Sequence, residues 1–290
     1  MMRPIIKKFG TVACDIVEAN PVVWKGEVWR CEWMHKVNPS NKLGVEYFHF
    51  VNRLTGQATA PFAQGFRFGC AYVEDGVAYV TGTRDNLLHM WASKDLATWE
   101  EWNVLKPTHY ELHNTSLAKA GDRYVLMFEI GGPVEECGVR FTARFATSAN
   151  LRDWEVTPPE CNYSKDRYTA PHCLRYLDAW FYDFYLEELP GWNFETRVVR
   201  SRDLVTWQAS PVGAVLQASA EDRLIANPAL TVEERARIAT AKNCNNSDID
   251  FCEFQGRLLI TYSWGDQVGT EHLAEAQYDG TQADFLRGWF

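Results

Sequence analysis

Ser93-Lys-Asp-Leu-Ala-Thr-Trp99 is a seven-residue motif that recurs as Ser148-Ala-Asn-Leu-Arg-Asp-Trp154 and Ser201-Arg-Asp-Leu-Val-Thr-Trp207. The three tryptophans stand 55 and 53 residues apart. Such a period is too long for helical solenoids and is typical of a four-stranded propeller blade. In each motif the Ser and Asp or Asn oxygens can accept hydrogen bonds from backbone amides and close a turn, while Leu and Trp can wedge between sheets. The motif therefore predicts a β-propeller.

Five turns, each followed by a strand-like segment, set the number of blades. The turns are Lys25-Gly26, Asp75-Gly76, Ala120-Gly121, Leu177-Asp178 and Gln255-Gly256. The segments after them are Val28–Trp33, Val77–Thr83, Tyr124–Ile130, Trp180–Leu186 and Leu258–Trp264. Aromatic and β-branched segments bounded by Gly or Asp predict strands. We predict an all-β fold, a five-bladed β-propeller, in one domain over residues 1–290.

The step between the fourth and fifth turns is the longest, which indicates an insertion at about 217–243. Thr231-Val-Glu-Glu234 matches a helix capping box, and good helix formers follow it. We therefore predict a short helix between blades four and five. This helix could decorate the surface, or it could form a lid or a wall at the channel mouth.

The formal net charge of −9 argues against nucleic acid and membrane partners. No segment approaches the length of about eighteen apolar residues that spans a membrane, and the basic start lacks the apolar segment of a signal peptide. The eight cysteines show no zinc-like spacing. We expect reduced thiols in a cytoplasmic protein and no cofactor. A divalent cation near Asp248 and Asp250, and the oligomeric state, stay open.

Side chains at the entrances of the inner strands should form a ring around the central channel. Aligned on their turns, the inner strands bring to this ring Glu18 and Asn20, Arg67, Glu111, His113 and Asn114, His172, and Asn246, Asp248 and Asp250. Asp248 and Asp250 should point together, because residues two apart on a strand share a face. Acidic residues are disfavoured inside strands, so the pair indicates a site, although a turn or a capped strand end would also explain it.

This ring has the groups that glycoside cleavage needs. One carboxyl must protonate the leaving oxygen while another activates water or attacks the anomeric carbon. The residues that we expect to carry catalysis are Asp248, Asp250, Glu18, Glu111 and His172. Those that we expect to bind a small carbohydrate substrate are His113, Asn20, Arg67, Asn114, Asn246 and Trp264. The histidines could instead be structural, and Arg67 could neutralise carboxylates rather than bind an acidic substrate group.

The five units, the motif and Ala19-Asn-Pro-Val-Val-Trp-Lys-Gly26 resemble the five-bladed β-propeller glycoside hydrolases, which include the arabinanase and β-xylosidase family (glycoside hydrolase family 43). The resemblance implies a glycosidase, with inversion as the usual outcome. At the positions of the family's three acids stand Asn20, Thr169, and Asn114 or Thr115. It therefore implies a distant member whose acids have moved.

We expect an exo-acting glycoside hydrolase. A non-catalytic glycan-binding propeller is an alternative, because the three family acids are replaced. A glycoside phosphorylase is another, in which Arg67 and nearby basic residues would hold phosphate in place of water.

Overall fold

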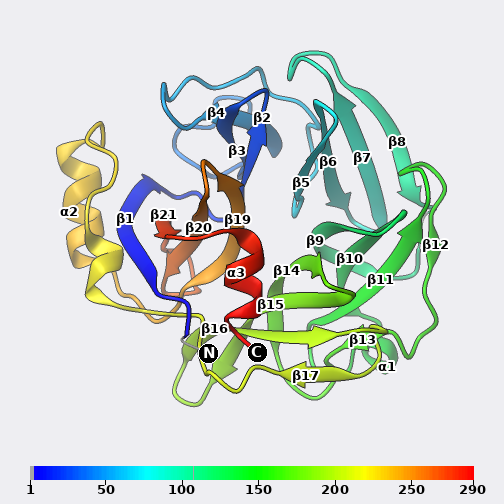
Figure 1. Ribbon diagram of the computed structural model, residues 1–290. Coiled ribbons are helices and arrows are strands. Elements are labelled where there is room, and N and C mark those ends of the chain that lie inside the picture. The colour runs from blue at the N-terminus through cyan, green and yellow to red at the C-terminus, as the bar shows by residue number, and fades with distance from the viewer. Residues whose placement is uncertain (1–2, 107) are drawn as a thin grey trace.

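The structure is a computed structural model that describes residues 3–106 and 108–290. Five antiparallel sheets stand around a central axis (Figure 1), which confirms the predicted five-bladed propeller. Each predicted turn lies where the innermost strand of a blade is joined to the second strand. The innermost strands border the channel, so their entrances decide what lines it.

The first four blades follow the chain order. Blade one consists of β2 (Ala19–Trp24), β3 (Glu27–Met34) and β4 (Tyr47–Asn52). Blade two consists of β5 (Ala71–Glu74), β6 (Val77–Arg84), β7 (Leu87–Ser93) and β8 (Glu100–Leu105). Blade three consists of β9 (Glu111–Ala120), β10 (Arg123–Gly132), β11 (Thr142–Ser148), β12 (Glu155–Val156) and β13 (Asn162–Tyr163). Blade four consists of β14 (Thr169–Leu177), β15 (Trp180–Leu189), β16 (Asn193–Ser201), β17 (Trp207–Ala209) and β18 (Leu216–Gln217).

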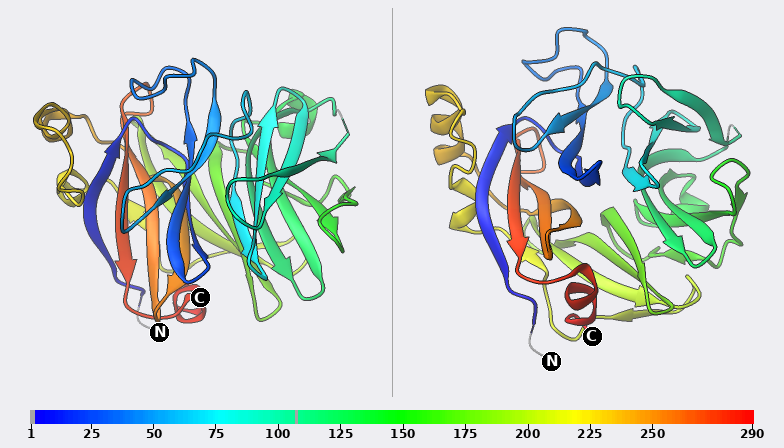
Figure 2. Two further views of the ribbon diagram at one scale, coloured as in Figure 1. Left: turned by 90° about the horizontal axis from the view of Figure 1, so that it is seen from above. Right: turned by 45° about the horizontal axis from the view of Figure 1, so that its top comes forward.

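Blade five joins the two ends of the chain. It consists of β19 (Ser247–Phe254), β20 (Arg257–Gly265), β21 (Glu271–Tyr278) and β1 (Ile6–Cys14). Its outermost strand is β1, which pairs antiparallel with β21 (Figure 2). The N-terminal strand therefore closes the ring, a pairing that the sequence analysis did not predict.

The repeated motif forms the turn that was expected of it. Ser93 Oγ accepts the backbone N–H groups of Asp95 and Leu96 at 3.2 and 2.8 Å, and the same pattern recurs at Ser201. The motif leucines are buried, and each belongs to a cluster shared by its own blade and the preceding one; they are Leu96, Leu151 and Leu204. The motif thus packs neighbouring blades together, as predicted.

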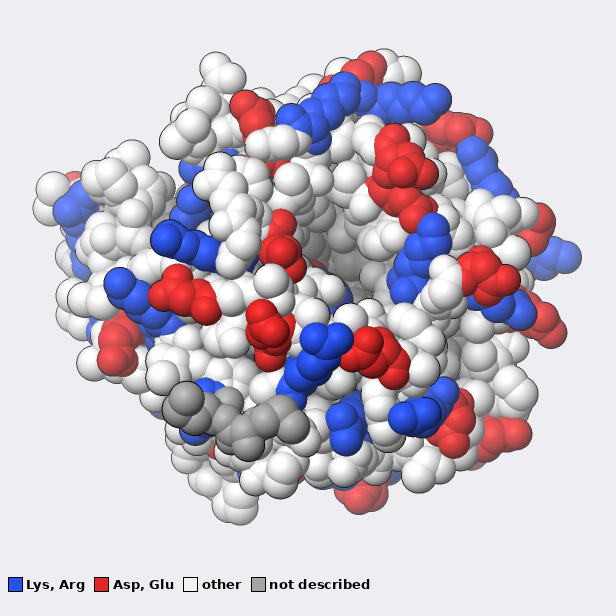
Figure 3. Space-filling view, in the orientation of Figure 1, with Lys and Arg blue, Asp and Glu red and all other residues white. Residues whose placement is uncertain are grey.

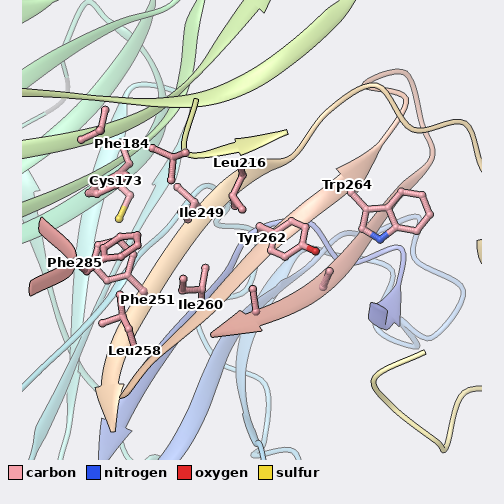
Figure 4. Close-up of a cluster of buried hydrophobic side chains, with 14 of the residues drawn as sticks. Cys173, Phe184, Leu216, Ile249, Phe251, Leu258, Ile260, Tyr262, Trp264 and Phe285 are labelled. Atoms are coloured by element: carbon pink, nitrogen blue, oxygen red, sulfur yellow. The ribbon is translucent and has the colours of Figure 1, made fainter. Parts of the chain in front are cut away.

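Aromatic packing also joins blades four and five (Figure 4). Phe184 of β15 stacks on Phe285 of α3 (Gln282–Arg287), with ring centroids 5.7 Å apart, and Phe251 of β19 meets both rings edge-on. The C-terminal helix therefore covers the junction of these two blades.

The insertion contains the predicted helix, α2 (Val232–Thr240), which lies outside blade five beside β1 (Figure 1). Its capping box is formed: Glu234 N–H donates to Thr231 Oγ1 at 3.2 Å, and Thr231 N–H donates to Glu234 Oε2 at 2.8 Å. The shorter helical segments are η1 (Ala220–Arg223) and α1 (Val134–Cys137). In the part of the chain that the structure describes, no helix is long and apolar enough to cross a membrane.

The channel has two different ends. The turns between the first and second strands of the blades lie at one end together with α3, and this end is called the turn end; the loops that lead into the inner strands lie at the other, called the loop end (Figure 2, left). Figure 3 shows the turn end, which is hollowed at its centre and surrounded by interspersed basic and acidic side chains. A cavity of about 340 Å³ there is bordered by Lys119, Arg175 and Gln282. All eight cysteines are free thiols, as expected.

Candidate active site

A cavity of about 360 Å³ opens at the loop end and will be called the central cavity. Its wall includes one equivalent residue from each blade, which stands eight residues before the second residue of the inner turn; these are Glu18, Phe68, His113, Ala170 and Asp248. The propeller repeat thus brings equivalent positions to one place. Glu18 and Asp248, far apart in sequence, lie on the wall of the same cavity.

Three inner strands carry a β-bulge at this cavity. The register shifts so that two residues of the inner strand oppose one of the second strand. The bulged pairs are His113 and Asn114 in β9, Ala170 and Pro171 in β14, and Asp248 and Ile249 in β19. Bulges re-aim side chains and are over-represented beside active sites.

Asp248 has a φ of +52°, in the left-handed region that most residues avoid. Its Oδ2 accepts a hydrogen bond from Ser247 Oγ at 2.6 Å and a second, short one from Ser263 Oγ. Burial raises the pKa of Asp248, and the two hydroxyls oppose that rise. An unusual backbone conformation that holds a buried carboxyl at a cavity wall is typical of a functional site.

Glu129 reaches the cavity from the second strand of blade three, opposite the bulge of β9, and its exposed fraction is 0%. Asn114 Nδ2 donates to its Oε2 at 3.1 Å, and the His172 backbone N–H donates to its Oε1 at 3.0 Å. Burial raises the pKa of Glu129 to about 7, although the His172 charge and these hydrogen bonds oppose the shift. Glu129 is therefore partly protonated near neutral pH.

Glu18 and Glu271 complete a group of four carboxyls from blades one, three and five. Burial, followed by the Asp248 and Glu129 charges, raises the pKa of Glu18 well above its usual value. Burial also raises the pKa of Glu271 to about 7, with a contribution from Asp248. Among the described residues, Oε2 of Glu18 and Oε2 of Glu271 are buried without a hydrogen-bond partner. Desolvation and repulsion between like charges therefore disfavour the ionisation of all four groups at once.

Aromatic rings form part of the cavity wall. Phe68, Phe141 and Tyr168 line it together with His113. The His113 ring packs against Phe68 and Phe141, with centroid distances of 5.2 and 4.4 Å. Burial lowers the pKa of His113, so its neutral form is favoured at this wall.

His172 lies deeper than the central cavity. Its buried ring meets Asp183 Oδ2 through Nδ1 at 2.8 Å and the Thr169 carbonyl through Nε2 at 2.6 Å. Burial opposes the charged ring, but the Asp183 charge and its hydrogen bond outweigh burial and raise the pKa of His172. The imidazole is therefore held between two acceptors, and the backbone N–H of His172 is the group that reaches Glu129.

Asp250 and Asn20 border a much smaller space of about 20 Å³, together with His172 and Asp248. Asn20 Nδ2 donates to Asp250 Oδ2 at 2.8 Å, and Arg175 forms an ion pair with Asp250. The bulge at Asp248 interrupts the strand alternation on which the expectation of parallel side chains depended. Asp248 and Asp250 consequently share this small space but have different partners, and of the two only Asp248 lines the central cavity.

Glu111 and Arg67 lie around the cavity rather than on its wall. Glu111 forms an ion pair with Arg140 and contacts His113 Nε2 at 3.1 Å, and about half of its side chain is exposed. The Arg67 guanidinium packs 5.0 Å from the Phe68 ring centroid and makes no side-chain hydrogen bond or ion pair within the described residues. Its charge lowers the pKa of Glu18, which fits a neutralising role.

The structure places Asn246 and Trp264 away from the central cavity. Ser263 faces Asp248, so the next residue, Trp264, points to the opposite face of β20. There it is fully buried and donates to Thr11 Oγ1 at 2.9 Å. The Asn246 amide is held by Lys8 and Asp222. The predicted substrate contacts of these two residues are therefore not part of the candidate site.

Sequence reasoning missed Glu129 and Glu271. Glu129 is an acidic residue inside an apolar strand, which is the signal that identified Asp248, but it lies on a second strand that was not aligned with the ring. Glu271 begins the third strand of blade five and reaches the cavity past Gly269. Within residues 3–106 and 108–290, no group of three or more His, Cys, Asp or Glu side chains is arranged to hold a metal ion.

The chain adopts the five-bladed fold of glycoside hydrolases such as those of family 43, as the resemblance in sequence implies. A thermostable family-43 glycoside hydrolase matches with a TM-score of 0.56 and 15% identity over 76% of this chain and 70% of that one. No protein-family profile and no curated protein sequence matches the chain.

Two other solved structures are more similar in shape. The structure of BT0996 in an RGII complex has a TM-score of 0.65 and 12% identity, over 95% of this chain and 92% of that one. The α-L-arabinofuranosidase of Podospora anserina in complex with cellotriose has a TM-score of 0.64 and 6% identity, over 95% of this chain and 94% of that one.

Proposed function

We propose that the protein is a glycoside hydrolase that acts in the central cavity. The observation that carries this proposal is the meeting of Glu18, Glu129, Asp248 and Glu271 on the wall of one cavity. Glu129 is fully buried, the other three carboxyls are partly buried, and all four have raised pKa values, so protonated and ionised forms can stand side by side near neutral pH. Glycoside cleavage needs both forms.

The reaction uses one carboxylic acid and one carboxylate. The acid gives its proton to the glycosidic oxygen as the bond from that oxygen to the anomeric carbon breaks. The carboxylate takes a proton from the water that attacks this carbon, if the reaction inverts, or attacks the carbon itself if it retains. We assign the carboxylate role to Asp248, because two serine hydroxyls stabilise its ionised form.

The cavity favours a neutral sugar at the end of a chain. Phe68, Phe141 and Tyr168 offer apolar surface to a sugar ring, and the surrounding carboxyls disfavour an anionic substrate. Beneath the cavity, the space of about 20 Å³ is too small for a further sugar. We further propose exo-action, cleavage with inversion and a cytoplasmic location, and the eight free thiols support the last of these.

A panel of 4-nitrophenyl glycosides, with and without phosphate, tests the proposal. It includes the α-L-arabinofuranoside and the β-D-xyloside, together with the matching oligosaccharides. Release without phosphate supports a hydrolase, whereas release only with phosphate indicates a phosphorylase. Sugar binding with no release in either condition indicates a glycan-binding propeller. Proton NMR of the first product anomer distinguishes inversion from retention.

A further inference from the structure

A second cavity adjoins the central one at the loop end. It measures about 440 Å³ and will be called the side cavity. The two cavities share Val17, Gly269 and Glu271 as wall residues. Of the four carboxyls on the wall of the central cavity, only Glu271 also borders the side cavity. This places a carboxyl at the junction between two cavities of ligand size.

We propose that the side cavity holds the leaving sugar of a substrate with at least two sugar units, and that Glu271 donates the proton to the oxygen between them. This inference rests on the proposed function. It deepens that function by assigning the acid and by requiring a disaccharide or longer glycoside.

The walls of the side cavity suit an uncharged sugar ring. Trp33, Val37 and Pro39 provide apolar surface, and Val37 is 73% exposed. Carbohydrates present apolar ring faces that pack well on aromatic side chains. Besides Glu271, the charged residues at the cavity are Asp15 and Arg237, which form an ion pair with each other, with Arg237 Nη1 2.9 Å from Asp15 Oδ2, so neither of these two charges calls for an ionic ligand.

The side cavity is built by segments outside the regular blade pattern. Val37 and Pro39 belong to the loop between β3 and β4, and Arg237 comes from α2 in the insertion. The insertion therefore contributes a wall beside the channel mouth rather than a lid over it. Loops that rise from a rigid scaffold commonly determine specificity.

The hydrogen bonds of Glu271 indicate which oxygen carries the proton. Oε1 accepts from Asn245 Nδ2 at 3.1 Å and from the Gln267 backbone N–H at 2.8 Å. Oε2 has no partner among the described residues. An oxygen that accepts two donors is unsuited to carry a proton, so the proton belongs on Oε2. Because Oε2 is buried, the Glu271 side chain must rotate to turn Oε2 toward the junction, where a glycosidic oxygen would supply the missing acceptor.

Proton transfer from Glu271 accompanies cleavage of the glycosidic bond. The Oε2–H bond breaks as the proton moves to the glycosidic oxygen, and the bond between this oxygen and the anomeric carbon breaks at the same time. The leaving sugar departs from the side cavity as a neutral alcohol. Water adds to the anomeric carbon and gives one proton to the Asp248 carboxylate on the other side of the sugar. Proton exchange with solvent then removes this proton from Asp248 and returns one to Glu271.

Two substrates whose leaving groups differ in their need for a proton test the role of Glu271. Glu271→Gln should lower kcat/KM for xylobiose or 1,5-arabinobiose at least about 100-fold. It should lower kcat/KM for the matching 2,4-dinitrophenyl glycoside less than tenfold, because dinitrophenolate leaves without a proton. Asp248→Asn is the comparison, since it should impair both substrates equally. Equal losses on both substrates in Glu271→Gln would overturn the assignment of the acid.

Binding tests the side cavity separately from turnover. In Asp248→Asn protein, calorimetry should show xylobiose or 1,5-arabinobiose binding at least tenfold more tightly than its monosaccharide. Adding Val37→Trp should abolish this difference by filling the side cavity. Adding Val205→Trp, at an exposed position in the motif of blade four, should leave the difference unchanged. If Asp248→Asn protein without Val37→Trp binds the disaccharide and the monosaccharide with equal affinity, the side cavity does not hold the leaving sugar. That result would leave the proposed function in place. A wild-type protein that neither binds nor cleaves any of these sugars would overturn the proposed function itself.

Discussion

The backbone N–H of His172 donates a hydrogen bond to Glu129 Oε1 at 3.0 Å, and this bond joins blade four to blade three beside the central cavity. Asn114, a position at which the resemblance in sequence implies an acid, holds the other oxygen of Glu129. The carboxyl therefore enters from the second strand of blade three. The neutral side chain of Asn114 thus helps to hold a carboxyl that comes from the neighbouring strand.

Asp248→Asn should lower turnover at least about 100-fold while the melting temperature changes little. Asparagine tolerates the left-handed conformation that Asp248 adopts, and its side-chain oxygen still accepts from the serines, so the substitution removes mainly the charge. Thermal unfolding and kinetics on the best glycoside measure the two effects. Glu253→Gln, at the turn end, is the matched control and should retain activity. Full activity in Asp248→Asn would falsify its role.

Ser263→Ala should move the acidic limb of the pH–rate profile to higher pH. The Ser263 hydroxyl opposes the rise in the pKa of Asp248 that burial causes, so its loss raises that pKa further. The carboxylate form is then populated only at higher pH. Ser116→Ala removes another buried hydroxyl, one that accepts the Leu174 backbone N–H, and should leave the limb in place. An unmoved limb in Ser263→Ala would mean that another group limits the rate at low pH.

Stability should fall as the pH rises from about 4.5 to about 7. Burial raises the pKa of Glu129 from 4.5 to about 7, so the folded state binds more protons than the unfolded state within this interval. The loss attributable to Glu129 is at most about 3 kcal/mol. Glu129→Gln should flatten the dependence, as measured by urea unfolding at pH 5 and pH 8. The same slope in both proteins would contradict this pKa.

Ser93→Ala and Ser201→Ala should each destabilise the protein by about 1 kcal/mol, because two backbone amides lose their acceptor. The motifs lie in blades two and four and share no partner, so the double variant should lose the sum within about 0.5 kcal/mol. Denaturant titration measures the effect, and activity should not change. If the double variant is no less stable than either single variant, the motif turns do not contribute independently to the free energy of unfolding.

The local repeat was enough to predict the blades. Ser93, Leu96 and Trp99 recur with their spacing, and each inner turn carries Gly or Asp, so strand number and alignment follow from short-range pattern. The same alignment predicted that Glu18 and Asp248 would meet. These predictions depend only on equivalent positions in equivalent blades.

The remaining site residues depend on irregularities that the repeat does not contain. The bulge in β19 gives Asp248 different contacts from those of Asp250. Glu129 is held in position by a hydrogen bond from the backbone of the next blade. Trp264 was expected to contact the substrate, but side chains alternate between the two faces of β20, and Trp264 points into the core. Register and cross-blade contacts cannot be derived from a single strand.

The pairing of β1 with β21 has a consequence for how the molecule is made. Ile6 lies opposite Tyr278, so β1 cannot pair with β21 until all five blades have been synthesised. Until then the ring stays open, and the edge of β21 that β1 covers is unpaired. Arg3 lies 5.9 Å from the Trp289 ring centroid. A short covalent link between these two segments would therefore keep β1 beside β21, and the chain could be opened between two other blades instead.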